Sequence, residues 1–229
     1  MECTGKDLPQ CRFFVSWSGG KDSCLALHRA MKKGSTPTFL FTMLDEGGER
    51  SHSHGLKREV LCAQAQSLGM PIIFRAASWD DYETAFLDGL SEIRAANVSA
   101  GVFGDIDLDD HRRWVERVCG SMGMAAEEPL WKGRRRDLLR EFMASGFQAT
   151  IVAVKDGVIS PDYLGRVLDM RVVQEFEYLG IDPSGEAGEY HTVVTDGPLF
   201  REPVAICPVA RTLKDGYWFL TVNVSPQHS

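Results

Sequence analysis

The chain has 229 residues, 44% of them hydrophobic, which is enough for one large domain or two small ones. Its formal charge of −7 makes it a poor candidate for bulk nucleic-acid binding. No apolar run is long enough to predict a membrane span, and residues 1–10 carry no apolar segment typical of a secretory signal. The scattered cysteines form no C-x-x-C pair, which favours free thiols over a metal or redox site. We therefore expect a cytoplasmic protein.

The first half of the sequence alternates between strand and helix patterns. Strands are expected near residues 12–16, 38–44, 72–75 and 101–103, with a short fifth strand near 125–128. Apolar residues at helical spacing predict helices from the glycine loop to Gly34, over 56–68 with Gly69 as C-cap, across a stripe of Tyr82, Phe86, Leu90 and Ile93, and from a cap at Asp109 or Asp110 to Gly123. This alternation indicates an α/β fold with a parallel sheet and helices on both faces.

In such sheets a ligand binds beyond the carboxyl ends of the strands, where the strand order reverses. Strands 12–16 and 101–103 both end in glycine and a polar residue, so we expect them to flank the cleft. The pattern changes at Pro129. Beyond it we expect helices near 136–145, 163–168 and 172–179, and strands near 150–155, 191–195, 204–210 and 217–224, with an Asp215-Gly216 turn. We place a domain boundary near residue 130, giving domains 1–130 and 131–229.

Ser18-Gly19-Gly20-Lys21-Asp22-Ser23 lies between the first strand and the first helix. Two glycines let backbone N–H groups approach a phosphate, the helix N-terminus adds partial positive charge, and Lys21 adds a full one. The G-x-x-x-x-G-K-[ST] pattern of a P-loop is not met, since Asp22 follows Lys21. The SGGKDS form resembles instead the PP-loop of ATP pyrophosphatases, which cleave ATP between the α- and β-phosphates.

Three further segments of the sequence contain polar residues, and each segment has both a functional and a purely structural interpretation. Asp105 ends the fourth strand and is either an Mg²⁺ or substrate ligand or a favourable charge at a helix N-terminus. His54, close to His52, lies either in a solvated loop or at a binding site. The run Gly185-Glu186-Ala187-Gly188-Glu189-Tyr190-His191 is either a glycine-rich hairpin or a site whose carboxylates bind a cation, orient an amine or act as a base.

Four blocks, in this order, resemble the diphthine–ammonia ligase family of PP-loop ATP pyrophosphatases. They are SGGKDS at 18–23, the His54-Gly55 loop with Ala63-Gln64-Ala65 and Leu68-Gly69-Met70-Pro71, Val102-Phe103-Gly104-Asp105-Ile106, and Gly185–Tyr190 with Thr192 and Asp196-Gly197-Pro198-Leu199-Phe200. The resemblance covers nearly the whole chain. It implies a HUP-type (adenine nucleotide α-hydrolase-like) α/β nucleotide-binding domain and a smaller α+β C-terminal domain.

The resemblance also implies roles for residues. The ATP side would consist of Ser16, Ser18, Gly19, Gly20, Lys21, Asp22, Ser23, Gly104 and the adenine wall Thr42, Met43 and Leu44. The acceptor or ammonia side would consist of His54, Gly185, Glu186, Gly188, Glu189, Tyr190 and His191. From the residues themselves we expect Lys21, Asp105, Glu186 and Glu189 to be catalytic. Asp22 either helps to hold Mg²⁺ or caps the helix, and Asp105 is the other candidate Mg²⁺ ligand. Cys24, next to the loop, is expected in the core rather than as a nucleophile.

The implied reaction is AMP-forming amide ligation: a carboxylate is adenylated by ATP, and ammonia then displaces AMP. In the family the carboxylate belongs to diphthine, a modified histidine of elongation factor 2. Here His191 replaces a glutamate usual in diphthamide-making members, and this form resembles the bacterial branch, so the acceptor could be an unknown small molecule. A PP-loop enzyme that modifies tRNA and a non-enzymatic ATP-binding protein are the alternatives.

Overall fold

The computed structural model describes residues 11–225 and divides the chain into two compact units. Among the described residues, unit 1 comprises residues 11–18, 22–49 and 70–132, and unit 2 comprises residues 19–21, 50–69 and 133–225. Two segments from the first half of the chain, residues 19–21 and 50–69, therefore belong to the unit formed mainly by the second half. Cys3 and the N-terminal segment expected to lack a signal lie outside the described residues.

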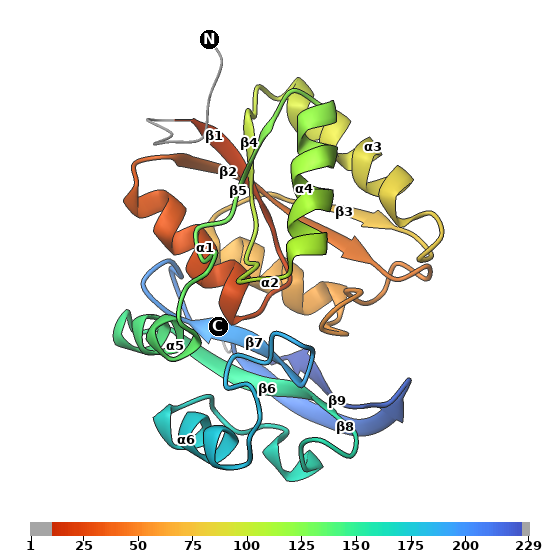
Figure 1. Ribbon diagram of the computed structural model, residues 1–229. Helices are drawn as coiled ribbons and strands as arrows, with labels where there is room; N and C mark the ends of the chain where they lie inside the picture. The colour runs from red at the N-terminus through yellow and green to blue at the C-terminus, as the bar shows by residue number, and fades with distance from the viewer. Residues whose placement is uncertain (1–10, 226–229) are drawn as a thin grey trace. The chain divides into compact units, whose positions relative to one another are not determined.

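Unit 1 is built on a five-stranded sheet in the order β3-β2-β1-β4-β5 (Figure 1), and every strand pair in it is parallel. Its strands are β1 (Arg12–Ser16), β2 (Thr36–Leu44), β3 (Ile72–Ala76), β4 (Ala100–Val102) and β5 (Ala125–Glu127). The strand order reverses between β1 and β4, which pair directly. The predicted parallel sheet and its predicted switch point are confirmed, and the carboxyl ends of β1 and β4 are where a ligand binds in folds of this kind.

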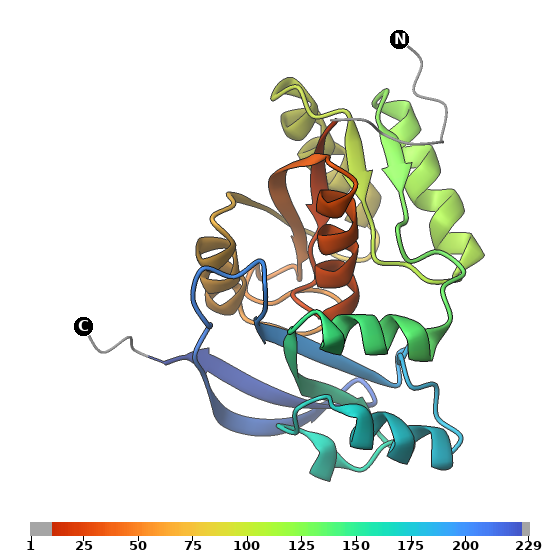
Figure 2. The same ribbon diagram turned by 90° about the vertical axis from the view of Figure 1, so that its left-hand side faces the viewer.

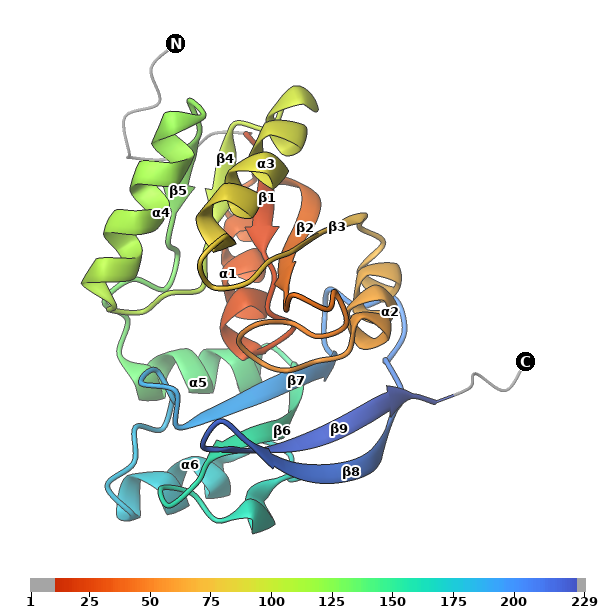
Figure 3. The same ribbon diagram turned by 90° about the vertical axis from the view of Figure 1, so that its right-hand side faces the viewer.

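Helices cover both faces of this sheet, as expected. Its helices are α1 (Lys21–Lys32), α3 (Tyr82–Ala95) and α4 (Asp109–Ser121). Figure 2 has α1 on the near side of the sheet, and Figure 3, from the opposite side, has α3 in front and α1 behind. A buried cluster joins Phe14 and Phe41 from the sheet to Phe86 and Leu90 on α3 and Val115 on α4. Burial of these large apolar side chains is the main force that holds the layers together.

Unit 2 contains a four-stranded antiparallel sheet in the order β7-β6-β9-β8. Its strands are β6 (Gln148–Lys155), β7 (Tyr190–Asp196), β8 (Ile206–Lys214) and β9 (Tyr217–Val224), and its helices are α2 (Arg58–Leu68), α5 (Arg135–Ala144) and α6 (Met170–Tyr178). In Figures 1 and 3, α2 and α5 lie on one side of this sheet and α6 on the other. Asp215 and Gly216 both have positive φ angles, and they form the predicted turn between β8 and β9.

Two expectations were wrong. The helix expected at 163–168 is a short 3-10 turn at Pro161–Tyr163, because Gly165 with φ +88° follows and residues 164–169 do not continue as a helix. The N-cap of α4 is Leu108 rather than Asp109 or Asp110, and it makes no side-chain cap hydrogen bond. Asp109 and Asp110 lie inside the first turn, where they still interact favourably with the helix dipole. No helix in residues 11–225 is both long and apolar enough to cross a membrane.

Candidate functional site

The SGGKDS loop follows β1 and runs into α1 as predicted. Gly19 has φ +80°, a conformation that side chains with a Cβ rarely adopt. Ser18 and Ser23, at the two ends of the loop and both in unit 1, share a hydrogen bond of 3.1 Å between their hydroxyl oxygens. The first helical residue is Lys21, so the positive end of α1 lies at the loop.

The middle of the loop, residues 19–21, is held by β7 within unit 2. The Val194 N–H donates to the Gly19 carbonyl at 2.9 Å, and the Lys21 N–H donates to the Thr192 hydroxyl at 3.1 Å. The buried amide of Gln64 on α2 donates to the same Gly19 carbonyl at 2.9 Å. These three hydrogen bonds restrain the loop backbone within unit 2.

The two loop glycines leave no room for larger residues. A Cβ on Gly19 would lie 2.7 Å from Leu56 Cδ1 and 2.8 Å from Gln64 Oε1. A Cβ on Gly20 would lie 2.2 Å from His54 Cε1, a distance that requires one group to move. The sequence predicted the need for glycine from the approach of a phosphate. The structure adds a second reason, which is the close packing of His54, Leu56 and α2.

Lys21 is 5% exposed, and its Nζ lies 4.9 Å above the centre of the Tyr190 ring. This is a cation–π contact within unit 2. The Tyr190 ring is fixed in turn, because its hydroxyl donates to the Pro183 carbonyl at 2.7 Å. Two predicted site residues, from the loop and from the glycine–glutamate run, are thereby brought together.

His54 and His191 also meet, with ring centres 4.6 Å apart. His54 Nδ1 donates to the Thr192 carbonyl at 2.8 Å, which fixes the ring and its tautomer, since a carbonyl can only accept. Burial and the nearby Lys21 charge lower the pKa of His54 to about 4. Burial, then His54 and Lys21, lower the pKa of His191 well below its ordinary value. Both imidazoles are therefore neutral at physiological pH, and the partly buried His54 ring lies against His191 rather than free in solvent.

The run Gly185–His191 forms a tight turn leading into β7. Gly185 and Gly188 have φ angles of +67° and +81°, and the Gly188 N–H donates to the Gly185 carbonyl at 3.0 Å. The buried Oε2 of Glu189 and the buried Oγ of Ser184 have no hydrogen-bond partner among the described residues. Buried polar atoms normally have a hydrogen-bond partner, so these two oxygens suit a ligand that donates hydrogen bonds. Glu186 is partly buried in the same turn.

Asp105 lies beyond the carboxyl end of β4, in unit 1. Gly104 before it packs so closely on the start of α1 that a Cβ would lie 2.9 Å from the Ser23 backbone nitrogen. Asp105 Oδ1 accepts a hydrogen bond of 2.7 Å from His111 Nδ1 on α4. Asp105 is therefore next to the loop–helix junction that carries Asp22.

The predicted adenine wall at the end of β2 is inside unit 1. Thr42, Met43 and Leu44 are all buried, and Met43 belongs to the hydrophobic core. The Thr42 hydroxyl donates to the Trp17 carbonyl at 2.6 Å. Ser16 is the last residue of β1 and is partly buried beside Phe41. Cys24 is fully buried, which raises the pKa of its thiol well above the ordinary value and agrees with the expected core role.

Comparisons with known proteins agree with this geometry. The family described as "Diphthamide synthase N-terminal domain" matches residues 11–126, and the one described as "Diphthamide synthase C-terminal domain" matches residues 134–224. The chain belongs to the diphthamide synthase family. Its relatives include the diphthine–ammonia ligases of Mus musculus, 26% identical, and Homo sapiens, 25% identical, each over 82% of this chain and 80% of the relative. Among solved structures, a predicted subunit of tRNA methyltransferase from Methanocaldococcus jannaschii aligns over 82% of this chain and 98% of its own at 18% identity, with a TM-score of 0.41, too low to carry an argument.

Sequence reasoning missed one titratable residue of this family member. Glu128 follows β5, as Asp105 follows β4, and its side chain is 5% exposed. Burial and then the Asp105 charge raise its pKa to about 7, although Arg112 Nε lies 3.3 Å from its Oε2. Its place after a strand of a parallel sheet was the one available signal. Gln64 belongs to the Ala63-Gln64-Ala65 motif, but no pattern in the sequence predicts its hydrogen bonds to Gly19 and to Val194 of β7.

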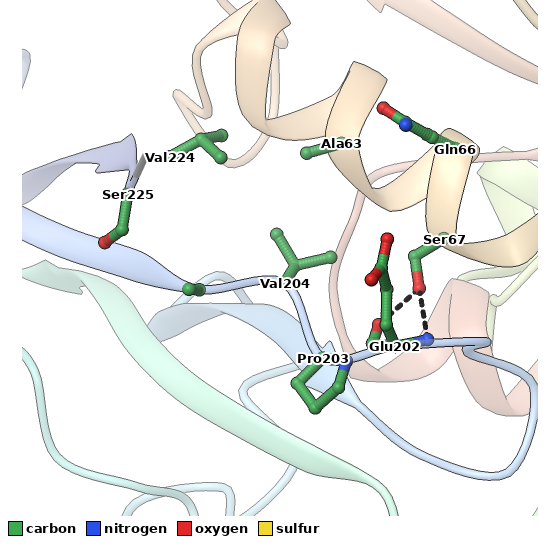
Figure 4. Close-up of a pocket in the computed structure, with 9 residues that line it drawn as sticks. Ala63, Gln66, Ser67, Glu202, Pro203, Val204, Val224 and Ser225 are labelled. Carbon is green, nitrogen blue, oxygen red and sulfur yellow. Dashed lines mark hydrogen bonds between the residues drawn. The ribbon is translucent and has the colours of Figure 1, made fainter. Parts of the chain in front are cut away.

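Unit 2 of this diphthamide synthase family member also contains a cavity of about 250 Å³ that no predicted site residue lines (Figure 4). It is lined by Ala63, Gln66 and Ser67 of α2, the segment Glu202–Ala205, and Val224 and Ser225 at the end of β9. The Ser67 hydroxyl bonds to both the carbonyl and the N–H of Glu202, which closes one wall (Figure 4). We assign no role to this cavity.

Proposed function

We propose that this protein is an ATP-dependent ligase that adenylates a carboxylate, releasing pyrophosphate, and transfers the acyl group to ammonia. Membership of the diphthamide synthase family and the names of the relatives support a ligase of this kind. The observation that carries the proposal is the SGGKDS loop at the reversal of strand order, with Lys21 at the first position of α1.

In this proposal residues 1–130 supply most of the ATP-binding groups, and residues 131–229 supply the acceptor side. Backbone N–H groups of the loop, the Ser18 and Ser23 hydroxyls and the Lys21 ammonium bind the phosphates. Ser16 and Gly104 flank the loop. The Thr42–Leu44 segment binds adenine through its backbone, since its side chains are buried.

The acceptor side comprises His54, Gly185, Glu186, Gly188, Glu189, Tyr190 and His191. Glu186 and Glu189 orient the amine or accept its proton. The buried Glu189 Oε2, without a partner among the described residues, fits a donor such as ammonium.

The two carboxylates that we propose as ligands of a magnesium ion are Asp22, in the loop, and Asp105, beyond the carboxyl end of β4. No cluster of three or more histidine, cysteine or acidic side chains that could hold a metal occurs among residues 11–225. Mg²⁺ in nucleotide sites is commonly held by one or two carboxylates plus phosphate oxygens and water, so two suffice. When bound, the ion would neutralise charge on the phosphates.

The proposed chemistry has two steps. A carboxylate oxygen attacks the α-phosphorus of ATP, the bond to the β-phosphate oxygen breaks, and pyrophosphate leaves. Lys21 and the loop N–H groups stabilise the charge that develops on the leaving group. The nitrogen of ammonia then attacks the acyl carbon, the carbon–oxygen bond to AMP breaks, and the proton lost by the nitrogen passes to a carboxylate such as Glu189 or Asp105 or to water.

The identity of the carboxylate is a separate part of the proposal. The relatives' names point to diphthine, and the resemblance of the sequence implies the diphthine of elongation factor 2. His191, whose ring lies tilted against that of His54, is neutral and supplies no negative charge where diphthamide-making members usually have glutamate. We therefore propose testing diphthine first and small carboxylic acids second.

The test is product analysis with Mg-ATP, ammonium and either diphthine-bearing elongation factor 2 or a panel of small acids. We expect acid-dependent formation of AMP and pyrophosphate together with an amide. Formation of ADP and phosphate would overturn the proposal. ATP binding without turnover across the panel would favour the non-enzymatic alternative, and turnover only with tRNA would favour the tRNA-modifying one.

A further inference from the structure

Gln64 is a fully buried polar side chain in the middle of α2. Its amide nitrogen donates to two backbone carbonyls, that of Gly19 at 2.9 Å and that of Val194 at 2.7 Å. Both partners can only accept, so the amide group must present its NH₂ to them. One side chain therefore joins the phosphate loop to β7 within unit 2.

The Gly19 carbonyl already accepts a hydrogen bond from the Val194 N–H. A second donor is not needed to satisfy this carbonyl, but it restrains the direction in which the carbonyl points. A trans peptide unit is planar, and its C=O and N–H point in opposite directions. Fixing the Gly19 carbonyl toward Gln64 and Val194 therefore fixes the Gly20 N–H on the opposite side of that peptide.

Packing alone does not account for this residue. The neighbouring buried positions of α2 include Val60, Leu61 and Ala65, which are apolar. A buried amide costs free energy unless it is fully hydrogen-bonded, and an apolar side chain of similar size avoids that cost.

We propose that Gln64 is a positioning residue for ATP: by holding the Gly19 carbonyl against β7, it orients the Gly19–Gly20 peptide for binding the phosphates. This inference rests on the proposed function, in which the loop binds ATP. It adds that the orientation of the loop depends on a side chain from α2 and on the Val194 carbonyl of β7, the strand that follows the Glu186–Tyr190 turn.

The experiment uses the full chain with Mg²⁺ and the α,β-methylene analogue of ATP, which cannot be cleaved between those phosphates. We compare wild type, Gln64→Met, Gln64→Glu and the control Gln66→Met, an exposed position two residues along the same helix. Gln64→Met, which cannot donate, should weaken analogue binding about 10- to 100-fold by calorimetry, and Gln66→Met should not. In turnover, the KM for ATP should rise with the KM for ammonium unchanged.

The Gln64→Glu variant separates hydrogen bonding from packing, because the pH dependence of its analogue affinity should change only if Gln64 acts as a hydrogen-bond donor. The ionised carboxylate faces two carbonyls and cannot donate, whereas the protonated acid has one O–H to donate. Its analogue affinity, relative to wild type at the same pH, should therefore recover as the pH falls from 8 to 5.5, and that of Gln64→Met should not. If Gln64→Met does not fold, the pH dependence of Gln64→Glu relative to wild type still tests the proposal.

The outcomes separate the two proposals. No analogue binding by the wild type would overturn the proposed function. Wild-type binding together with unchanged affinity in a folded Gln64→Met, or with no pH-dependent recovery in Gln64→Glu, would overturn the role of Gln64 alone.

Discussion

The two compact units treat buried charge in opposite ways. Unit 2 places Lys21 near two histidines, and burial together with the Lys21 charge lowers the pKa of both, so that the two imidazoles are neutral at physiological pH. Unit 1 places Asp105 near Glu128, whose pKa is raised to about 7, so that much of the second negative charge is removed. In each unit one charged group is accompanied by ionisable groups held close to neutral. This limits the repulsion that like charges cause in a low-dielectric interior.

The largest expected effect comes from Lys21 of unit 2, which contributes to lowering the pKa of both neighbouring histidines. In the proposed reaction, Lys21→Ala removes a positive charge that stabilises the leaving pyrophosphate, so turnover should fall about 1000-fold or more. The measurement is the rate of AMP release at saturating ATP. The same change should raise the pKa of His54 and His191, because Lys21 contributes to lowering both. Wild-type turnover in a folded Lys21→Ala would contradict the assignment.

The second prediction concerns the packing that keeps His54 in place. Gly20→Ala puts a methyl group 2.2 Å from His54 Cε1, and that ring is fixed by its hydrogen bond to the Thr192 carbonyl. We expect a loss of about 1 to 3 kcal/mol in the free energy of unfolding, together with weaker ATP binding.

Gly120→Ala is the matched control for this change. Nothing lies within 4 Å of the added carbon, and alanine in α4 should be neutral or stabilising by up to about 1 kcal/mol. The double variant Gly20→Ala/His54→Ala should recover part of the lost stability. If the double variant is less stable than the two single changes predict by addition, the clash is not the cause.

The sequence predicted unit 1 well because its signals are local. Apolar periodicity and glycine stops placed the strands of its sheet and the helices α1, α3 and α4 within about two residues. Six consecutive residues predicted the loop, and the reaction class that they suggest stays a prediction. The sequence could not show that residues 19–21 and 50–69 join unit 2, because the hydrogen bonds of Gly19 and Lys21 to β7 span more than 170 residues. The pKa shift of Glu128 likewise depends on burial and on Asp105, which no local pattern encodes.

Glu128 offers the third test, in unit 1. Its folded pKa of about 7 lies above its ordinary 4.5, so the group's contribution to stability is fully present below pH 4.5 and is lost as the pH rises through 7. Glu128→Gln imitates the protonated form and should be more stable than wild type at pH 8, by up to about 3 kcal/mol, and equal to it at pH 4.5. Denaturant unfolding at the two pH values without added metal is the measurement. An equal difference at both would mean that ionisation of Glu128 is not responsible.

The smallest expected effect has the opposite sign and lies in unit 2. The folded pKa of His54, about 4, lies below its ordinary 6.5, so both states are neutral above pH 6.5. As the pH falls below 6.5, the unfolded chain binds a proton that the folded chain does not, and stability is lost down to about pH 4. Because the ring is only partly buried, we expect about 1 to 2 kcal/mol from His54, with a further loss in the same direction from His191.

His54→Asn isolates this contribution, since the asparagine amide can still donate to the Thr192 carbonyl but does not titrate. The variant should lose less stability than wild type between pH 6.5 and 4.5 and should match its pH dependence between 7 and 8. In the double variant His54→Asn/Glu128→Gln, the free energy of unfolding should depend less on pH than in wild type, both on the acid side and on the alkaline side. The two changes should contribute additively, because the two groups belong to different units and share no partner. A non-additive double variant would show that the opposite charge arrangements of the two units are coupled rather than independent.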